Sequence, residues 1–195
     1  MFLCQMSGLP GTGKSTLARH ICKLTNAVLL DTDVVKSSIL NSFENNIDFK
    51  FASKVAYETI FSLADSNLHI GNSVVIDSPC RYDIIIAQGT SIAQKYKVPY
   101  KFIECRLAIE HLQELNRRRV MREILPSQEV NIPINEEEYI KGMKSFVRPT
   151  NHEYLIVDTA HDIESYIGKV AEYLNLTKNH NNCKELTPQA PYNKF

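Results

Sequence analysis

Four residues near the start of the chain have the types and spacing that bind phosphate groups. The pattern G-x-x-x-x-G-K-[ST] is filled, within the segment SGLPGTGKST, by Gly8, Gly13, Lys14 and Ser15. Glycines let backbone N–H groups come close to a phosphate, because no Cβ atom blocks the approach. In loops of this kind the lysine reaches the β- and γ-phosphates and the next hydroxyl binds Mg²⁺. The sequence therefore predicts a loop that binds a nucleoside triphosphate together with Mg²⁺.

The residues on either side of this loop have the patterns that the motif requires. The apolar run FLCQM at 2–6 has the length of a buried strand, and Leu17, Ala18 and Ile21 recur at helical spacing after the loop. The start of that helix adds unpaired N–H groups and a positive dipole end. We expect the ATP phosphates to be bound by Gly8, Pro10, Gly11, Thr12, Gly13, Lys14, Ser15 and Thr16.

Three aspartates follow two further apolar runs and are candidates for metal binding and proton transfer. Asp77 ends the run VVI and is placed to hold Mg²⁺, although an Asp there could also cap a helix or stabilise a turn. Asp33 could accept the proton of an attacking hydroxyl, or could cap the helix that begins at Val34. Asp31 is the rival candidate, and spacing alone does not choose between the two.

Basic residues offer several candidates for contact with phosphate. The densest cluster is Arg117, Arg118, Arg119 and Arg122, at the end of a predicted helix. Such a run is often solvated, and it also suits the negative end of the helix dipole. The functional alternative is that one or two of these arginines close over the phosphates and neutralise the transferring phosphoryl.

Two more cations each follow a candidate aspartate. Lys36 comes after Asp33, and Arg81 comes after Asp77. They could bind the molecule that accepts the phosphoryl group, contact a phosphate, or face water. We take them as the predicted acceptor-binding residues.

The remaining sequence alternates between apolar runs and helical patterns. Strands are predicted at 27–30, 74–76, 100–105 and 154–157, and helices at 34–40, 50–68, 84–96, 109–119 and 163–174. This alternation predicts an α/β fold of three layers, with a five-stranded parallel sheet and helices on both faces. Ligands of such sheets bind beyond the carboxyl ends of the strands, where the glycine loop and the aspartates lie.

Length and composition fit one soluble globular domain. Residues 1–176 form the predicted kinase-like domain, with a possible mobile lid at about 120–138, and the polar residues 177–195 are expected to be a disordered tail. The chain holds 22 basic and 22 acidic residues, and this balance disfavours a long nucleic acid as partner.

The sequence also indicates the cellular compartment in which the protein is expected. The five cysteines form no C-x-x-C pair, so neither a zinc site nor a disulfide framework is expected. No apolar run is long enough to span a membrane, and the glycine loop begins too early to leave room for a targeting segment before it. We expect a cytoplasmic protein; its oligomeric state does not follow from the sequence.

These residues resemble a known family. The segments GLPGTGKSTLA, LLDTDVVKSSIL, VVIDSPCRYD, YKFIECR, NRRRVMR and YLIVDT, in this order, are similar to small P-loop kinases often labelled "AAA domain" ATP-binding proteins. The resemblance covers about residues 2–174 and implies a P-loop NTPase fold of the nucleoside-kinase type. Relatives of the group include the kinase domain of polynucleotide 5′-hydroxyl kinase, zeta-toxin-like kinases and small-molecule phosphotransferases.

The resemblance implies roles for particular residues. It favours Asp33 over Asp31 as the general base, places Lys36 near the acceptor, and makes Arg119 the lid arginine that acts on the transferring phosphoryl. Polynucleotide kinases carry an arginine where this chain has Lys36. Lysine keeps the charge but lacks the bidentate fork of arginine, which disfavours nucleic-acid 5′ ends as acceptors.

The sequence thus leads to one expected function and two alternatives. The expectation is an ATP-dependent kinase that moves the γ-phosphoryl of ATP to a hydroxyl of a small-molecule acceptor, with Lys14, Asp33 and Arg119 as catalytic residues and Ser15 and Asp77 as Mg²⁺ ligands. One alternative is a nucleotide-dependent switch or slow NTPase that has no acceptor besides water. The other is a kinase of nucleic-acid 5′-hydroxyl ends.

Overall fold

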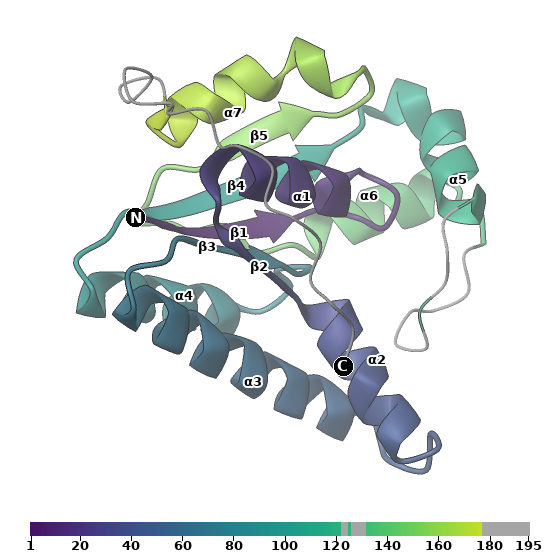
Figure 1. Ribbon diagram of the computed structural model, residues 1–195. Helices are drawn as coiled ribbons and strands as arrows, with labels where there is room; N and C mark the ends of the chain where they lie inside the picture. The colour runs from purple at the N-terminus through teal and green to yellow at the C-terminus, as the bar shows by residue number, and fades with distance from the viewer. Residues whose placement is uncertain (122–124, 126–131, 177–195) are drawn as a thin grey trace, which may run out of the picture.

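The structure is a computed structural model of the chain, and it describes residues 1–121, 125 and 132–176. Within these residues, five parallel strands form one sheet in the order β2-β3-β1-β4-β5 (Figure 1). The predicted α/β fold with a five-stranded parallel sheet is confirmed. The strands are β1 (Leu3–Ser7), β2 (Val28–Asp31), β3 (Val74–Asp77), β4 (Tyr100–Arg106) and β5 (Leu155–Asp158).

Helices connect the strands and lie on both faces of the sheet. Their bounds are α1 (Lys14–Thr25), α2 (Thr32–Ser42), α3 (Phe49–His69), α4 (Asp83–Lys95), α5 (Leu112–Met121), α6 (Glu136–Lys144) and α7 (Ile167–Tyr173), with the 3₁₀ turns η1 (Ile109–His111) and η2 (Ile163–Ser165). In this part of the chain no helix is both long enough and apolar enough to cross a membrane.

The core consists of two apolar layers, one on each face of the sheet. Met6 and Val75 pack with α1 and α7 on one face, while Leu3, Ile76 and Phe102 pack with α3 and α4 on the other. In Figure 1, α3 and α4 lie below the sheet, α7 lies above it, and α1 is drawn in front of the strands. A parallel sheet covered on both faces needs strands that are apolar throughout, which explains runs such as VVI and FLCQM.

Helix α6 is an element that the sequence analysis did not identify. It begins with a capping box, in which the Asn135 side chain accepts from the Glu138 amide and the Glu138 side chain accepts from the Asn135 amide. Residues 122–124 and 126–131 of the predicted lid lie outside the described residues, and so do Arg122 and the predicted tail at 177–195. Helix α6 begins at the end of the lid segment predicted at 120–138.

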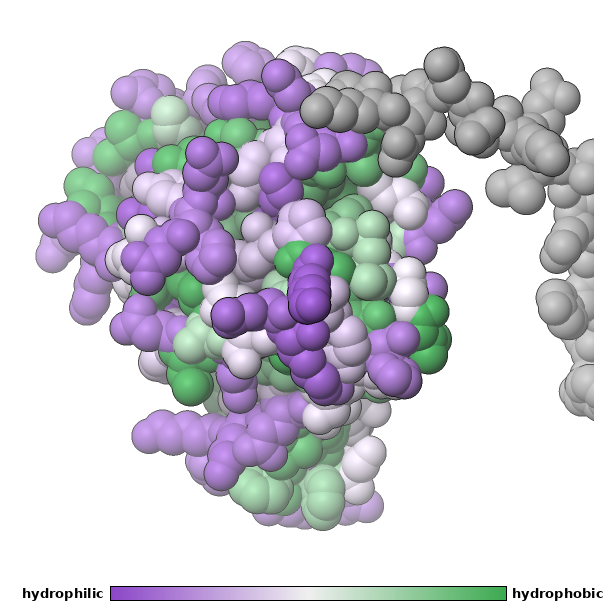
Figure 2. Space-filling model, turned by 90° about the vertical axis from the view of Figure 1, so that its left-hand side faces the viewer, coloured by the Kyte–Doolittle hydropathy of each residue, from purple (hydrophilic) through white to green (hydrophobic). Residues whose placement is uncertain are grey.

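The carboxyl ends of the strands lie at the right of Figure 1, where the loop at 8–13 and the residues after β2 and β3 come together. Figure 2 views the opposite end, where hydrophilic side chains cover much of the surface and apolar ones are scattered among them. Ligands of parallel α/β sheets bind beyond the carboxyl ends of the strands, so the predicted site is expected at the carboxyl end.

A buried ion pair ties β4 to the segment after α6. The Glu104 side chain is fully buried and accepts hydrogen bonds from Arg106 and from Arg148, whose Nη2 lies 3.1 Å from Oε1. Burial alone would raise the pKa of Glu104, but the hydrogen bonds from Arg148 and Arg106 outweigh it and hold the pKa below its ordinary value. The carboxylate therefore stays charged inside the fold.

Replacing Glu104 by glutamine is expected to lower the free energy of unfolding by about 3 kcal/mol at pH 7, because two guanidinium groups lose their charged acceptor. A group with a lowered pKa stabilises the fold above its unfolded pKa, and the stabilisation is lost as the pH falls through its folded pKa. The difference between wild type and Glu104→Gln should thus shrink below about pH 4. Urea unfolding at pH 7 and pH 3.5 measures this, and an equal difference at both pH values would contradict it.

Candidate active site

The loop between β1 and α1 is held in a shape that its glycines permit. Gly8, Gly11 and Gly13 have φ values of 140°, 92° and 76°, which other residues rarely adopt. A Cβ atom on Gly8 would lie 2.5 Å from the Cys105 carbonyl oxygen and 2.6 Å from Thr12 Oγ1. The close approach to β4 therefore requires glycine at position 8.

Replacing Gly8 by alanine is expected to destabilise the fold by at least about 1 kcal/mol more than Gly71→Ala does. Gly71 is the matched control, because its φ is also positive at 92° but nothing lies within 4 Å of its added Cβ. Both variants carry the backbone strain, and only Gly8→Ala adds the clash. Urea unfolding compares them, and equal losses would show that the close contact with β4 does not restrict the loop.

Two threonines hold the loop in place through hydrogen bonds, one within the loop and one from the segment after β5. The Thr12 hydroxyl donates to the Leu9 carbonyl over 2.8 Å. The Thr159 hydroxyl, just beyond β5, lies 2.7 Å from the Thr12 carbonyl oxygen and 2.9 Å from that of Arg106. Thr159 is buried and was not identified from the sequence, although a polar residue directly after a predicted strand is a signal for this edge.

The start of α1 leaves its first amides available to a ligand. Gly13 is the N-cap residue and supplies no side-chain hydrogen bond to the first turn. Such N–H groups and the helix dipole favour an anion. Lys14 is the first helical residue and only 9% exposed, while Ser15 and Thr16 follow in the same turn. The structure thus brings the predicted phosphate-binding residues of the loop and the helix start together.

The two rival aspartates after β2 lie in different surroundings. The Asp31 side chain caps α2 and accepts from the amides of Asp33 and Val34 at 2.9 and 3.3 Å. Burial, and next the negative charge of Asp77, raise the pKa of Asp31. Asp33 instead lines a cavity, with its Oδ1 atom 3.4 Å from Lys36 Nζ. Asp31 therefore serves as the helix cap, and Asp33 is the one exposed to a ligand.

Asp77 has a buried oxygen with no hydrogen-bond partner. Its side chain is 4% exposed, it lies beside Asp31 in the sheet register, and its Oδ1 atom is unpaired within the described part of the chain. Buried oxygens are nearly always paired, so this one fits a partner that is not part of the chain. Oxygen ligands such as carboxylates and hydroxyls are those that Mg²⁺ prefers, and Asp77 with Ser15 fits the ion.

Residues 1–121, 125 and 132–176 contain no group of three or more histidine, cysteine or acidic side chains that could hold a metal alone. An ion here would therefore take most of its ligands from phosphate and water, as Mg²⁺ commonly does. This fits a pair of protein ligands rather than a closed metal cage.

A cavity of about 700 Å³ lies next to the loop, a volume typical of small-ligand sites. Its wall includes apolar and aromatic side chains from α3 and from the start of α4, such as Tyr57, Tyr82 and Ile85. The Tyr57 hydroxyl donates to the Pro79 carbonyl, and burial raises the pKa of this phenol, so it remains protonated. The predicted site residues that line the cavity are Pro10, Lys14, Asp33, Lys36, Arg81 and Arg119.

Positive charge dominates this cavity although the whole chain is balanced. Its lining holds six cations and two carboxylates, and the structure shows ion pairs between Lys36 and Asp33 and between Lys54 and Glu58. An excess of cations in a recess attracts an anionic ligand. The cations are Lys14, Lys36, Lys50, Lys54, Arg81 and Arg119. Lys50 and Lys54 were not identified from the sequence, because they follow no motif and lie on a helix face.

The three consecutive arginines of α5 differ in their contacts, although Arg117 and Arg118 share Glu114 as a partner. Arg119 donates to the Pro10 and Ile132 carbonyls, and its Cγ atom lies against Gly11. Arg118 donates to the Thr159 carbonyl over 2.8 Å and so joins α5 to the loop after β5. Arg117 pairs with Glu114, and the hydrogen bonds from Arg117 and Arg118 lower the pKa of that carboxyl to about 2. Of the three, Arg119 lines the cavity.

Solved structures of other proteins share this fold. A candidate kinase from Chloroflexus aurantiacus superposes with a TM-score of 0.66 at 18% identity, over 88% of this chain and 97% of that one. A gluconokinase from Sinorhizobium meliloti gives 0.57 at 14% identity, over 91% and 97%. The APS kinase of Mycobacterium tuberculosis, in complex with AMPPNP and APS, gives 0.55 at 16% identity, over 89% and 96%.

At these identities the structural likeness establishes the fold alone. The sequence itself matches a family model described as "AAA domain" over residues 3–149. This range includes the phosphate-binding loop, the aspartates after β2 and β3, and the arginines of α5. The chain belongs to the AAA domain family.

Proposed function

We propose that this protein is an ATP-dependent phosphotransferase that moves the γ-phosphoryl group of ATP to a hydroxyl of a small, anionic acceptor. The observation that carries the proposal is that a single cavity is lined both by Lys14 of the phosphate-binding loop and by the pair of Asp33 and Lys36. A donor phosphate and an acceptor hydroxyl can therefore meet in one recess.

ATP would lie with its phosphates on the loop between β1 and α1. The amides of the loop and of the first turn of α1 would hold the phosphate oxygens, and Lys14 would neutralise charge on the phosphoryl group. Arg119, held against the loop through the Pro10 carbonyl, is placed to add a second positive charge. Charge neutralisation and positioning supply most of the rate enhancement in this chemistry.

A bound Mg²⁺ would supply positive charge to offset the negative charge that develops during phosphoryl transfer. Ser15 and Asp77 are the residues that would hold it. The unpaired, buried oxygen of Asp77 supports this role, because the ion would supply its missing partner.

Asp33 would orient the acceptor hydroxyl and take its proton. In this step the hydroxyl oxygen forms a bond to the γ-phosphorus, the bond from that phosphorus to the β-phosphate oxygen breaks, and ADP leaves. Lys36, 3.4 Å from Asp33, would hold the carboxylate in place and stand beside the acceptor. General base catalysis of this type contributes about 10²–10⁴-fold in rate.

The cavity also indicates what kind of acceptor fits. Once Lys14 and Arg119 are used by ATP, Lys50 and Arg81 remain as cations that form no ion pair with another described residue. The Arg81 guanidinium lies over the Phe146 ring, 5.8 Å from the ring centroid, and this contact restrains its position. A carboxylate or phosphate on the acceptor would match these charges, and the Tyr82 and Ile84 side chains would contact its carbon frame.

A screen with ATP labelled on the γ-phosphate tests the proposal. The panel contains small hydroxy acids, phosphorylated alcohols, neutral polyols of the same size and a 5′-hydroxyl oligonucleotide. We expect transfer to an anionic alcohol, and an increase in its KM of about tenfold in Arg81→Ala, because a charged hydrogen bond is lost. Transfer of label to water alone would support a slow NTPase, and transfer to the oligonucleotide with strong salt dependence would support a nucleic-acid kinase. Either result would overturn the proposal.

A further inference from the structure

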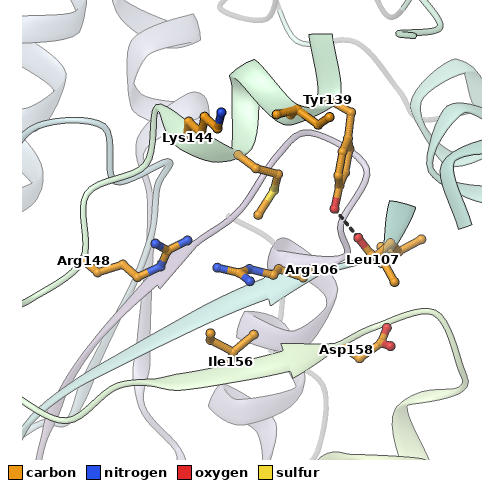
Figure 3. A pocket seen from close by; sticks show the side chains of 10 residues that line it. Arg106, Leu107, Tyr139, Lys144, Arg148, Ile156 and Asp158 are labelled. Carbon is orange, nitrogen blue, oxygen red and sulfur yellow. Dashed lines mark hydrogen bonds between the residues drawn. The ribbon is translucent and has the colours of Figure 1, made fainter. Parts of the chain in front are cut away.

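A second cavity lies at the opposite edge of the sheet from α2 and α3. It has a volume of about 490 Å³ and shares no lining residue with the cavity beside the phosphate-binding loop. Figure 3 shows it between β5 below and α6 above. Its volume lies in the range of small-ligand sites, and the proposed phosphoryl transfer uses none of its lining residues.

Side chains of β4 and β5 form one side of this cavity, its floor. The register of the two strands determines which side chains these are. Arg106 pairs with Asp158 and Glu104 pairs with Ile156, so these four side chains point to the same face of the sheet. Helices α3 and α4 cover the earlier strands on this face. The edge formed by β4 and β5 is left for α6 to cover, and the cavity forms between them.

Helix α6 forms the facing side of the cavity, its roof, and specific contacts hold the helix in position. The Tyr139 hydroxyl of α6 donates to the Leu107 carbonyl just after β4, as Figure 3 shows. One turn further along α6, a Cβ atom on Gly142 would lie 2.8 Å from Leu9 Cδ2, so helix and loop are in close contact. These contacts hold the roof at a set height above the strands.

Two guanidinium groups meet on the floor. Figure 3 shows the Arg106 and Arg148 side chains pointing toward each other across the cavity. Both donate to the buried Glu104, Arg106 through Nε and Arg148 through Nε and Nη2. Among the described residues, these hydrogen bonds occupy Nε of Arg106 and both Nε and Nη2 of Arg148, and they do not use the other Nη atoms. Donors therefore remain available for a ligand.

The charged side chains around this cavity sum to one net positive charge. Three cations, Arg106, Lys144 and Arg148, face two carboxylates, the lining Asp158 and the buried Glu104. Asp158 already accepts a hydrogen bond from the Ala160 amide. One negative charge on a ligand would balance the group, and a planar carboxylate matches the geometry of guanidinium donors.

The rest of the lining is apolar. Ile140 on the roof and Ile156 on the floor are 42% and 36% exposed, and Leu107, Ala108 and Met143 complete the wall. An apolar wall beside a few placed charges is the usual composition of a site for an organic ligand rather than for a bare inorganic ion.

We propose that this cavity is a binding site for a small organic monoanion, whose carboxylate contacts Arg106 and Arg148 and whose aliphatic body lies between Ile156 and Met143. The proposal does not depend on the phosphotransferase reaction, because the two cavities have separate linings.

Calorimetric titration of the full chain with acetate, butyrate and hexanoate tests it. We expect the affinity to rise about twofold to fourfold with each added CH₂ group, as apolar surface is buried. Hexanamide, the uncharged analogue of hexanoate, should bind at least about tenfold more weakly, because it lacks the charge. Inorganic phosphate should bind more weakly than hexanoate.

Ile156→Glu places a tethered carboxylate beside the two arginines and should remove hexanoate binding. Ile70→Glu is the matched control, because it makes the same change at an exposed position outside the cavity and should bind hexanoate like wild type. A melting temperature close to that of wild type shows that each variant is folded. The proposal is overturned by hexanoate binding that Ile156→Glu leaves unchanged, by phosphate or hexanamide binding as tightly as hexanoate, or by no saturable binding at millimolar hexanoate.

Discussion

Replacing Lys14 by alanine is expected to lower the rate of phosphoryl transfer by about 10²–10³-fold, the effect of removing one preorganised charge from the transition state. Lys14 is the first residue of α1 and is only 9% exposed. A water molecule at the same position could not replace its positive charge, which is what stabilises the transferring phosphoryl group. Binding of MgATP should also weaken, since the positive charge acts on the bound phosphates as well.

Lys23→Ala is the matched control for this prediction. Lys23 is exposed in the last turn of the same helix, so the variant changes the net charge of the chain equally but not the site. We expect it to transfer phosphate at the rate of wild type. Equal rates in wild type, Lys14→Ala and Lys23→Ala would show that the reaction does not take place on this loop.

Asp33→Asn is expected to lower transfer to the acceptor by about 10²–10⁴-fold while leaving MgATP binding nearly unchanged. Asparagine keeps the size of the side chain and its hydrogen-bonding oxygen, but it cannot take a proton from the acceptor. Single-turnover kinetics with labelled ATP measure the chemical step, and calorimetry measures MgATP binding separately.

Asp31→Asn removes the same charge two residues earlier. Asparagine caps helices about as well as aspartate does, so the hydrogen bonds to the amides of Asp33 and Val34 should persist. We therefore expect this variant to keep most of its activity. A loss in Asp31→Asn with normal rates in Asp33→Asn would reverse the assignment of the general base.

The sequence was most informative where a local pattern determines the structure. The glycine loop, the apolar runs of the sheet and the helical repeats all depend on short-range spacing, and the predicted strands and their connecting helices were confirmed. The capping box at Asn135 and Glu138 is also a local signal that marks α6, but this region lacks the apolar period that identifies long helices.

Other features depend on how distant segments pack. Asp31 and Asp33 could not be separated by spacing, because two residues at the start of one helix are equivalent until their surroundings are known. In the fold Asp31 faces backbone amides and Asp33 faces the cavity. Likewise Lys50 and Lys54 join the cavity only because α3 lies beside the loop after β3. Their placement is a property of the tertiary structure.

Calorimetric titration of the intact, wild-type chain with MgATP tests the account most directly, because every later step requires the triphosphate on the loop at 8–16. We predict saturable binding of one nucleotide per chain, a matching rise in melting temperature, and affinity at least about tenfold weaker in Lys14→Ala. A chain that unfolds cooperatively yet shows neither heat of binding nor a thermal shift with millimolar MgATP would contradict the account.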